Sequence, residues 1–228
     1  MKIYADNRML ACGLIGGTLS RHSGNMRHVP DQAPIYKALG IDPAAILHFQ
    51  QVHGTRIITV SSERPATQPV QEADAWLFAP LHKGFGAAIV TADCVPLFMW
   101  DNTAQYAALA HCGWRGVAAG LPGKVAAALC KFTSATTLYA WLGPHIQACC
   151  FEVQAEVARQ FPAPCVIHKN DKLFVDLTSA ITAQLEQTGL KKTQIHAPYY
   201  CTCGERENFF SWRRDHQKNL MLSFIYKP

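Results

Sequence analysis

Three side chains able to bind a metal or act as a nucleophile stand in turn-like settings: His53, Cys94 and His111. Each lies at the end of a predicted strand or close to a Gly or Pro, where a side chain is held firmly beside solvent. Two imidazoles and one thiolate are a known ligand set for catalytic zinc, with a fourth position left for water or substrate. Their intervals match no local metal motif, so spacing alone leaves buried thiol and core histidines as an open alternative.

Other polar residues near these segments predict roles in proton transfer or anion binding. Asp93, beside the candidate thiolate, suits a general base or an acceptor for a ligating imidazole, or else an exposed turn carboxylate. Arg115 suits bidentate phosphate binding or pairing with a carboxylate. Arg213 and Arg214 are candidate phosphate contacts, and with Asp215 they also fit an internal ion-pair network.

Two further groups of residues are assigned to the protein interior. Trp114 and Phe210 have faces that stack on a purine, but a core role is favoured for both. Four cysteines near each other in pairs lack a Cys-x-x-Cys motif, so we expect inert buried thiols and not a second metal cluster. They are Cys149, Cys150, Cys201 and Cys203.

Composition and missing motifs exclude several classes of protein. The 228 residues are 49% hydrophobic and 16% charged, which fits a folded chain, and we expect one domain spanning 1–228. A net charge of +5 without a basic stripe argues against nucleic-acid binding. The most apolar stretch, 85–100, contains Asp93 and Pro96 and is too short for a bilayer. An odd number of cysteines, nine, favours reduced thiols in a cytoplasm. Signatures of P-loop, dinucleotide-binding, zincin, α/β-hydrolase and zinc deaminase sites are absent.

Strands alternate with helices along the chain, which predicts an α/β or α+β fold. A helix starting after Asp176 and ending at Gly189 follows from apolar residues every four positions. Two further helices are expected, from Val153 to Phe161 and from Val117 to Phe132, with Pro122 in a first turn or at a kink. The predicted strands are Arg56–Ser61, Gly86–Val90, Val95–Trp100, Tyr106–His111, Thr137–Leu142 and Met221–Tyr226.

Seven segments in order resemble the YfiH-type family, whose members are variously called multicopper polyphenol oxidases or purine nucleoside phosphorylases. The resemblance runs from about Gly16 to Asp215. It is carried by Gln-Val-His-Gly (51–54), Ala-Asp-Ala (73–75), Thr-Ala-Asp-Cys-Val-Pro (91–96), His-Cys-Gly-Trp-Arg-Gly (111–116), Gly-Pro (143–144), Cys-Phe-Glu-Val (150–153) and Phe-Phe-Ser-Trp-Arg-Arg-Asp (209–215).

The resemblance implies a four-layer α-β-β-α sandwich and a zinc ion bound by His53, Cys94 and His111. It further implies an enzyme that splits adenosine, inosine or methylthioadenosine with phosphate and also deaminates adenosine. One zinc carrying one thiolate has a net charge of about +1, which suits phosphate or hydroxide as the nucleophile.

Two other enzyme classes stay open. In the first, Cys94 is a nucleophile activated by His111, in a hydrolase or deamidase like the toxins that share this fold, or in a factor that edits peptidoglycan precursors. In the second, the three ligands hold a single copper for phenol oxidation, although multicopper chemistry requires more clustered histidines. A small-molecule substrate is expected in every case, and the oligomeric state is unknown.

The chain departs from the family pattern at two places close to the expected site. Cys112 stands where the family usually has Ala, which adds a thiol able to oxidise or to contact a second metal. Asn219 and Leu220 replace a Gly-Arg pair, so the anion contact expected of that arginine is not carried over to this chain. The segment between Asn25 and Tyr36 is shorter than usual.

Overall fold

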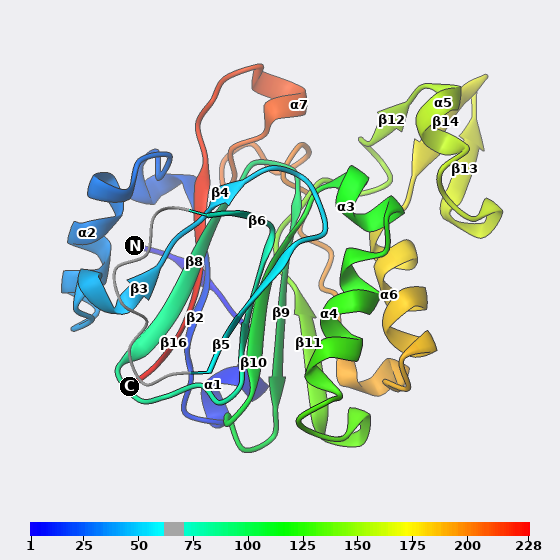
Figure 1. The fold of residues 1–228 in the computed structure, drawn as a ribbon. Helices are drawn as coiled ribbons and strands as arrows, with labels where there is room; N and C mark the ends of the chain where they lie inside the picture. The colour runs from blue at the N-terminus through cyan, green and yellow to red at the C-terminus, as the bar shows by residue number, and fades with distance from the viewer. Residues whose placement is uncertain (62–70) are drawn as a thin grey trace.

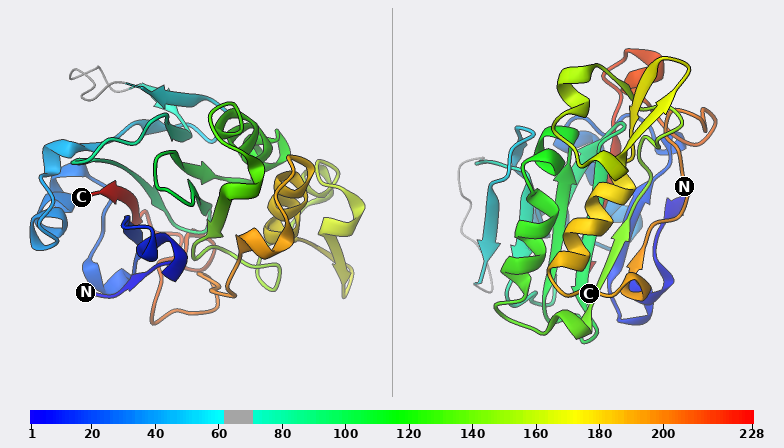
Figure 2. Two further views of the ribbon diagram at one scale, coloured as in Figure 1. Left: turned by 90° about the horizontal axis from the view of Figure 1, so that it is seen from below. Right: turned by 90° about the vertical axis from the view of Figure 1, so that its right-hand side faces the viewer.

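Two β-sheets pack face to face at the centre of the molecule, and helices cover the outer side of each (Figure 1; Figure 2). The computed structural model describes residues 1–61 and 71–228. Helix α2 (Val29–Ala38) lies outside one sheet, and helices α4 (Leu121–Leu129) and α6 (Leu177–Gln187) lie outside the other. These four layers confirm the α-β-β-α sandwich expected from the sequence.

The five-stranded sheet joins both ends of the chain to its middle. Strand β16, from the C-terminal end, lies between β2 and β8 and is antiparallel to both. The order is β1 (Ile3–Tyr4), β2 (Ile15–Leu19), β16 (Met221–Lys227), β8 (Phe85–Thr91) and β3 (Ile46–Leu47).

The six-stranded sheet contains the most apolar strands of the molecule. Every residue of β9 and β10 is buried, because sheet covers one face and helix the other; this explains their unbroken apolar runs. The six strands predicted from the sequence are all confirmed; four of them lie in this sheet, and the other two are β8 and β16 of the five-stranded sheet. The order is β15 (Ile195–His196), β11 (Leu138–Leu142), β9 (Val95–Asp101), β10 (Ala107–Cys112), β7 (Ala75–Phe78) and β5 (Ile57–Val60).

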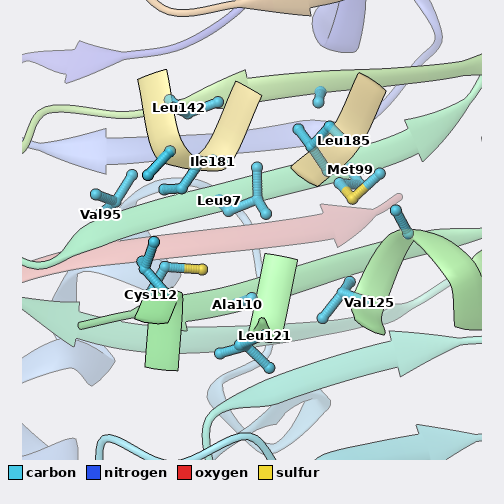
Figure 3. Close-up of a cluster of buried hydrophobic side chains, with 14 of the residues drawn as sticks. Val95, Leu97, Met99, Ala110, Cys112, Leu121, Val125, Leu142, Ile181 and Leu185 are labelled. Atoms are coloured by element: carbon cyan, nitrogen blue, oxygen red, sulfur yellow. The ribbon is translucent and has the colours of Figure 1, made fainter. Parts of the chain in front are cut away.

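Three hydrophobic layers separate the four layers of structure. Large aromatic side chains, among them Phe98, Trp100 and Trp141, fill the space between the sheets. Leu97 and other residues on the opposite face of β9 pack with Ile181 and Leu185 of α6 (Figure 3). Such fully buried side chains each contribute about 1.5–3 kcal/mol to folding, so the six-stranded sheet is a rigid platform for residues at its ends.

Helix ends follow the capping residues in the sequence. Asp176 accepts a hydrogen bond from the amide of Ser179 at 2.9 Å, which confirms the predicted start of α6. The helix expected over Val117–Phe132 is broken into α3 (Trp114–Ala118) and α4, because Gly120 adopts a left-handed conformation with φ +83°. Pro122 lies in the first turn of α4, as predicted.

The part of the chain that follows β11 and precedes α6 forms a small three-stranded sheet, which stands apart from the sandwich (Figure 1). The helix predicted from Val153 to Phe161 is wrong in extent: α5 covers only Ala155–Ala158. Val153 instead pairs with Leu173 in an antiparallel ladder, so its apolar side chain serves a strand. The small sheet has the order β12 (Glu152–Val153), β14 (Lys172–Val175) and β13 (Val166–Lys169).

The remaining elements are short. None of the described helices is long and apolar enough to cross a membrane. All nine cysteines carry free thiols. The other helices and strands are α1 (Asn7–Ala11), α7 (Trp212–Asp215) and the parallel pair β4 (Gln50–Gln51) and β6 (Glu72–Ala73); 3-10 turns occupy Arg21–Ser23, Pro43–Ala45, Ala135–Thr137, Ala163–Cys165 and Lys192–Gln194.

Candidate metal centre

The register of the six-stranded sheet brings the candidate ligands to one end. Cys94 directly precedes β9, and His111 is the penultimate residue of β10, where it lies opposite Pro96. Asp74 directly precedes β7, and its carbonyl accepts a hydrogen bond from the amide of His111 at 2.7 Å. His53 lies in the loop that enters β5, the next strand of the same sheet.

His53, Cys94 and His111, hereafter the His-Cys-His cluster, offer one ligand atom each within 4.8 Å of one another. The two imidazole rings stand edge to face, with centroids 4.7 Å apart and planes at 83°. His111 is buried, Cys94 is half-buried and His53 is exposed. The cluster therefore has a closed side within the fold and an open side toward solvent.

The carboxylate of Asp74 positions two of the three ligands. One oxygen lies 2.8 Å from Nδ1 of His111, which leaves Nε2 free to face the cluster. The same carboxylate accepts the amide hydrogens of His53, at 2.9 Å, and Gly54, at 2.6 Å. Burial raises the pKa of Asp74, but these hydrogen bonds outweigh it and hold that pKa below its usual value. Asp74 was quoted within a sequence motif but not recognised as a site residue.

Cys94 and His111 are electrostatically coupled. Burial alone would raise the pKa of the Cys94 thiol, but the charge on His111 and hydrogen bonds from both histidines lower it to about 6. Burial alone would lower the pKa of His111, but the Cys94 thiolate and Asp74 raise it to about 9. Cys94 is thus a thiolate near neutral pH, which is the form that binds metals and attacks electrophiles.

Two residues of the cluster region have positive φ angles, which residues other than glycine seldom adopt. His53 has φ +60° and Asp93 has φ +88°, both in or near the left-handed region. Gln51 secures the first of these turns, because its side-chain amide exchanges two hydrogen bonds of 2.8 Å with the backbone of Val90. Strained conformations persist where the surrounding contacts fix them, and they concentrate at functional sites.

Gly113 packs directly against two members of the cluster. A Cβ at this position would lie 2.7 Å from Cδ2 of His53 and 3.3 Å from Sγ of Cys94, so a larger residue would displace both side chains. Two imidazoles and a thiolate fit a metal of borderline softness such as Zn²⁺, and they do not fit Mg²⁺ or Ca²⁺, which require oxygen ligands. Copper is compatible with the same donor set.

Asp93 lies beside the cluster, and both oxygens of its carboxylate have other partners. They accept hydrogen bonds from the hydroxyl of Thr202, at 2.6 Å, and from the amide of Arg213, at 2.7 Å. The acceptor for the candidate imidazole ligand is Asp74 and not Asp93, because a carboxylate oxygen of Asp74, just before the neighbouring strand β7, lies 2.8 Å from Nδ1 of His111. Asp93 joins α7 and the loop of Thr202 to the thiolate turn.

A cavity of about 860 Å³ opens above the cluster, and four basic side chains line it. Its aromatic wall includes Trp114, which was assigned to the core but also borders the cavity, together with Phe49 and Trp212, which were not anticipated. Phe210 is buried between the sheets, which confirms its core assignment. The basic residues of the wall are Arg27, Arg115, Arg213 and Lys218.

The three arginines predicted to bind phosphate occupy different environments. The guanidinium of Arg115 lies 4.3 Å from the ring centre of Trp114 and, within the described residues, forms no ion pair. Arg213 lines the cavity but also donates to the carbonyl of Glu152 at 2.7 Å. Arg214 is not in the cavity wall; it pairs with Asp215 at 2.6 Å and donates to three backbone carbonyls, as an internal ion-pair network would.

Residues 21–227 match the family model described as "Multi-copper polyphenol oxidoreductase laccase". The chain belongs to this family. It is 33% identical to "Purine nucleoside phosphorylase YfiH" of Escherichia coli over 91% of this chain and 85% of that protein. It is 32% identical to a purine nucleoside phosphorylase of Streptomyces coelicolor over 83% of this chain and 78% of that one.

Solved structures of the YfiH type share the fold. The protein YlmD of Geobacillus stearothermophilus superposes with a TM-score of 0.84 at 26% identity, covering 94% of this chain and 92% of that one. The YfiH protein of Bacillus licheniformis also gives 0.84, at 21% identity, covering 94% and 93%. The family assignment made from the sequence motifs is confirmed.

The two departures from the family pattern fall in different places. Cys112 points into the hydrophobic layer between the sheet and the helices (Figure 3), and burial raises its pKa well above the usual value. It does not join the metal ligands, which corrects the suggestion of a second metal contact; the alternation of side chains along β10 sends it to the face opposite His111. Leu220 is half-buried and lines the cavity, so an arginine at this position would reach the same space.

The prediction that four cysteines are all buried thiols is wrong. Cys149, Cys150 and Cys201, hereafter the thiol cluster, offer sulfur atoms within 4.8 Å of one another. They are not uniformly buried, because Cys149 is exposed. Cys149 and Cys150 lie in one loop and Cys201 lies in another. The isolated parallel bridge between His145 and Cys201 brings the two loops together.

Proposed function

We propose that this chain is a metal-dependent purine nucleoside phosphorylase that cleaves adenosine, inosine and methylthioadenosine, and that it also deaminates adenosine. One observation carries the proposal: the His-Cys-His cluster lies at the base of a cavity with both aromatic and basic walls. A volume of about 860 Å³ is within the range of small-molecule sites. The names of the relatives support the same reaction.

His53, Cys94 and His111 are the residues that would hold the metal, with Zn²⁺ the best match to their chemistry. When bound, such an ion supplies a Lewis-acid charge of about +1 that attracts a phosphate oxygen or hydroxide. Asp74 fixes the tautomer of His111 and holds the turn of His53, so the ligand atoms are in place before substrate arrives. These three residues are therefore the first to test by substitution.

Side chains of the cavity wall would bind phosphate and the purine ring. Arg115 and Lys218 have no carboxylate partner among the described residues and are available to bind phosphate. Trp114, Phe49 and Trp212 offer faces for a purine ring. In phosphorolysis, a phosphate oxygen forms a bond to the ribose C1′ while the bond to the purine nitrogen breaks, and the purine keeps the electron pair and takes a proton. Deamination replaces the phosphate by water, which attacks the purine ring and releases ammonia.

The decisive experiment compares nucleosides with and without phosphate on protein of known metal content. Release of free base and ribose 1-phosphate is expected only with phosphate, and conversion of adenosine to inosine is expected without it. Both activities should disappear in His53→Ala, since this ligand serves both nucleophiles. If neither reaction occurs in metal-loaded protein, the proposal fails. Oxidation of a phenol by copper-loaded protein would instead support the oxidase chemistry in the family description.

A second candidate, a cysteine hydrolase, is favoured by the chain of contacts from Asp74 through His111 to Cys94. A nucleophile, a base and an orienting carboxylate form the same arrangement in cysteine hydrolases. A metal-bound thiolate resists alkylation, whereas a free nucleophile reacts and forms an acyl-enzyme. Covalent trapping of substrate on Cys94 in metal-loaded protein would support the hydrolase.

The pH dependence of alkylation adds a quantitative test. In metal-free protein, the reaction of Cys94 with iodoacetamide should increase as the pH rises through about 6, since the thiolate forms there and not near 9, the usual value. His111→Ala should move this midpoint upward by removing the positive charge. An unchanged midpoint in that variant would contradict the coupling between the two residues.

A further inference from the structure

The thiol cluster lies outside the cavity residues described above and contains three sulfur atoms that nothing in the proposed reaction uses. Sγ of Cys149 lies 3.3 Å from Sγ of Cys150 and 3.6 Å from Sγ of Cys201. A disulfide requires about 2.0 Å between sulfur atoms, so these are separate thiols. Thiolates around one tetrahedral zinc, with Zn–S bonds of about 2.3 Å, lie about 3.8 Å apart. The observed separations are close to that value.

A fourth thiol adjoins the cluster. Cys203 lies two residues after Cys201, and its side chain contacts the thiol of Cys150. Its sulfur is not among the three that lie within 4.8 Å of one another, so its side chain must shift to complete a four-cysteine site. Four cysteines are the ligand set of closed, structural zinc sites. Cys149 and Cys150 are adjacent in one loop, and one residue separates Cys201 from Cys203 in the other. The two loops meet at the bridge between His145 and Cys201.

The backbone around the cluster is arranged to support negative sulfur. The amide of Gly204 donates a hydrogen bond to Sγ of Cys201 at 3.3 Å, and a backbone group of Gln147 makes a second such contact. Amide hydrogens directed at sulfur stabilise a thiolate and recur around metal-bound cysteines.

Positive charge lies next to the same two loops. Arg214 donates to the carbonyl of Cys203 at 3.1 Å, and Arg213 donates to the carbonyl of Cys150 at 3.4 Å. Zinc with four thiolates carries a net charge of about −2. Arg213 would balance part of this charge, whereas Arg214 is already paired with Asp215. The cluster thus has soft ligands, amide donors and charge compensation from separate parts of the chain.

We propose that Cys149, Cys150 and Cys201 bind a second zinc ion, with Cys203 as the fourth ligand. The site is structural, because all four positions are filled by protein sulfur and no place remains for substrate. It joins the loop that leads into the small sheet to the loop whose Thr202 holds Asp93. It stabilises the wall of the cavity without taking part in the reaction.

Zinc content of the full-length protein tests this directly. Wild-type protein purified in the presence of a reductant should contain two zinc ions per chain. The double variant Cys149→Ser/Cys201→Ser should contain one, and His53→Ala/His111→Ala should keep the other. Cys130→Ser is the matched control, because Cys130 is half-buried but belongs to neither cluster, and it should retain two.

A measurement on the unmodified protein keeps the test decisive if the double variant does not fold. Cys149 is exposed, so as a free thiol it would react readily with iodoacetamide. We expect protection in the zinc-loaded protein and labelling once a chelator is added. Zinc X-ray absorption of the His53→Ala/His111→Ala variant should show only sulfur neighbours, at about 2.3 Å. Labelling that ignores the chelator, a mass lower by two hydrogens from a disulfide, or one zinc that is lost with His111, would each overturn the proposal.

Discussion

The two cysteine-containing clusters differ in both donors and support. The His-Cys-His cluster mixes nitrogen with sulfur and sits on strand ends whose register is fixed by the six-stranded sheet. One side of it opens to the cavity. The thiol cluster contains only sulfur and is built on two loops. An open site on a rigid platform suits reaction, whereas a closed site between loops suits stabilisation. Donor type and position in the fold therefore both separate two groups that are alike in containing cysteine.

The largest expected effect comes from removing a ligand of the open cluster. His111→Ala should abolish metal binding there and reduce phosphorolysis to background, because it removes a buried ligand and the partner of Asp74. The thiol cluster should keep its zinc. Metal analysis and base release measured on the same preparation check both statements. Full metal content at the His-Cys-His cluster in this variant would contradict the ligand assignment.

A smaller effect is expected from Asp74→Asn, which leaves all three ligands in place. Metal affinity should fall by roughly 10–100-fold, since the carboxylate orients His111 and the turn of His53. Asp101→Asn is the matched control: Asp101 is also buried and accepts bonds from Thr103 and Tyr106, at the far end of the same sheet. Titration with a competing chelator measures the affinities. Equal losses in both variants would assign Asp74 a purely structural role.

Leu220→Arg probes the cavity and not the metal. An added guanidinium should lower the phosphate concentration needed for half-maximal rate by roughly tenfold, equivalent to about 1.4 kcal/mol. Metal content should not change. Leu220→Met controls for the loss of the leucine side chain without adding charge. A phosphate requirement equal to that of the Met variant would mean that this position does not contact phosphate.

The smallest effect is expected at Cys112, which is next to His111 in sequence but faces the opposite layer. Cys112→Ala should leave the metal content at both clusters unchanged. The free energy of unfolding should fall by about 1–2 kcal/mol, because a buried sulfur is replaced by a small void. Denaturant unfolding and zinc analysis measure these quantities. Loss of a zinc ion would place Cys112 among the ligands.

The sequence was most informative where hydrophobic pattern and strand ends coincide. All six predicted strands are present. Cys94 and His111 meet because β9 and β10 are neighbours, and Asp74, which directly precedes β7, holds the loop of His53 beside them. Asp74 was not identified, since its role depends on facing His111 across a sheet edge, which no local spacing reports. The sequence analysis favoured buried thiols over a cluster at Cys149, Cys150 and Cys201, because no local motif reports that two loops far apart in the chain meet there. Val153 was misassigned because an apolar residue beside a short helix serves equally well in a strand.

The small sheet is closed at its base by backbone hydrogen bonds, from the amide of Val175 to Phe151, at 3.1 Å, and from that of Asp176 to Cys165, at 2.8 Å. The segment 152–174 therefore leaves the sandwich and returns to it at one place. Insertions or deletions near Asn170, at the tip of the β13–β14 hairpin, therefore leave the strand register of the sandwich unchanged. The small sheet thus gives protein engineers a segment to exchange as a unit.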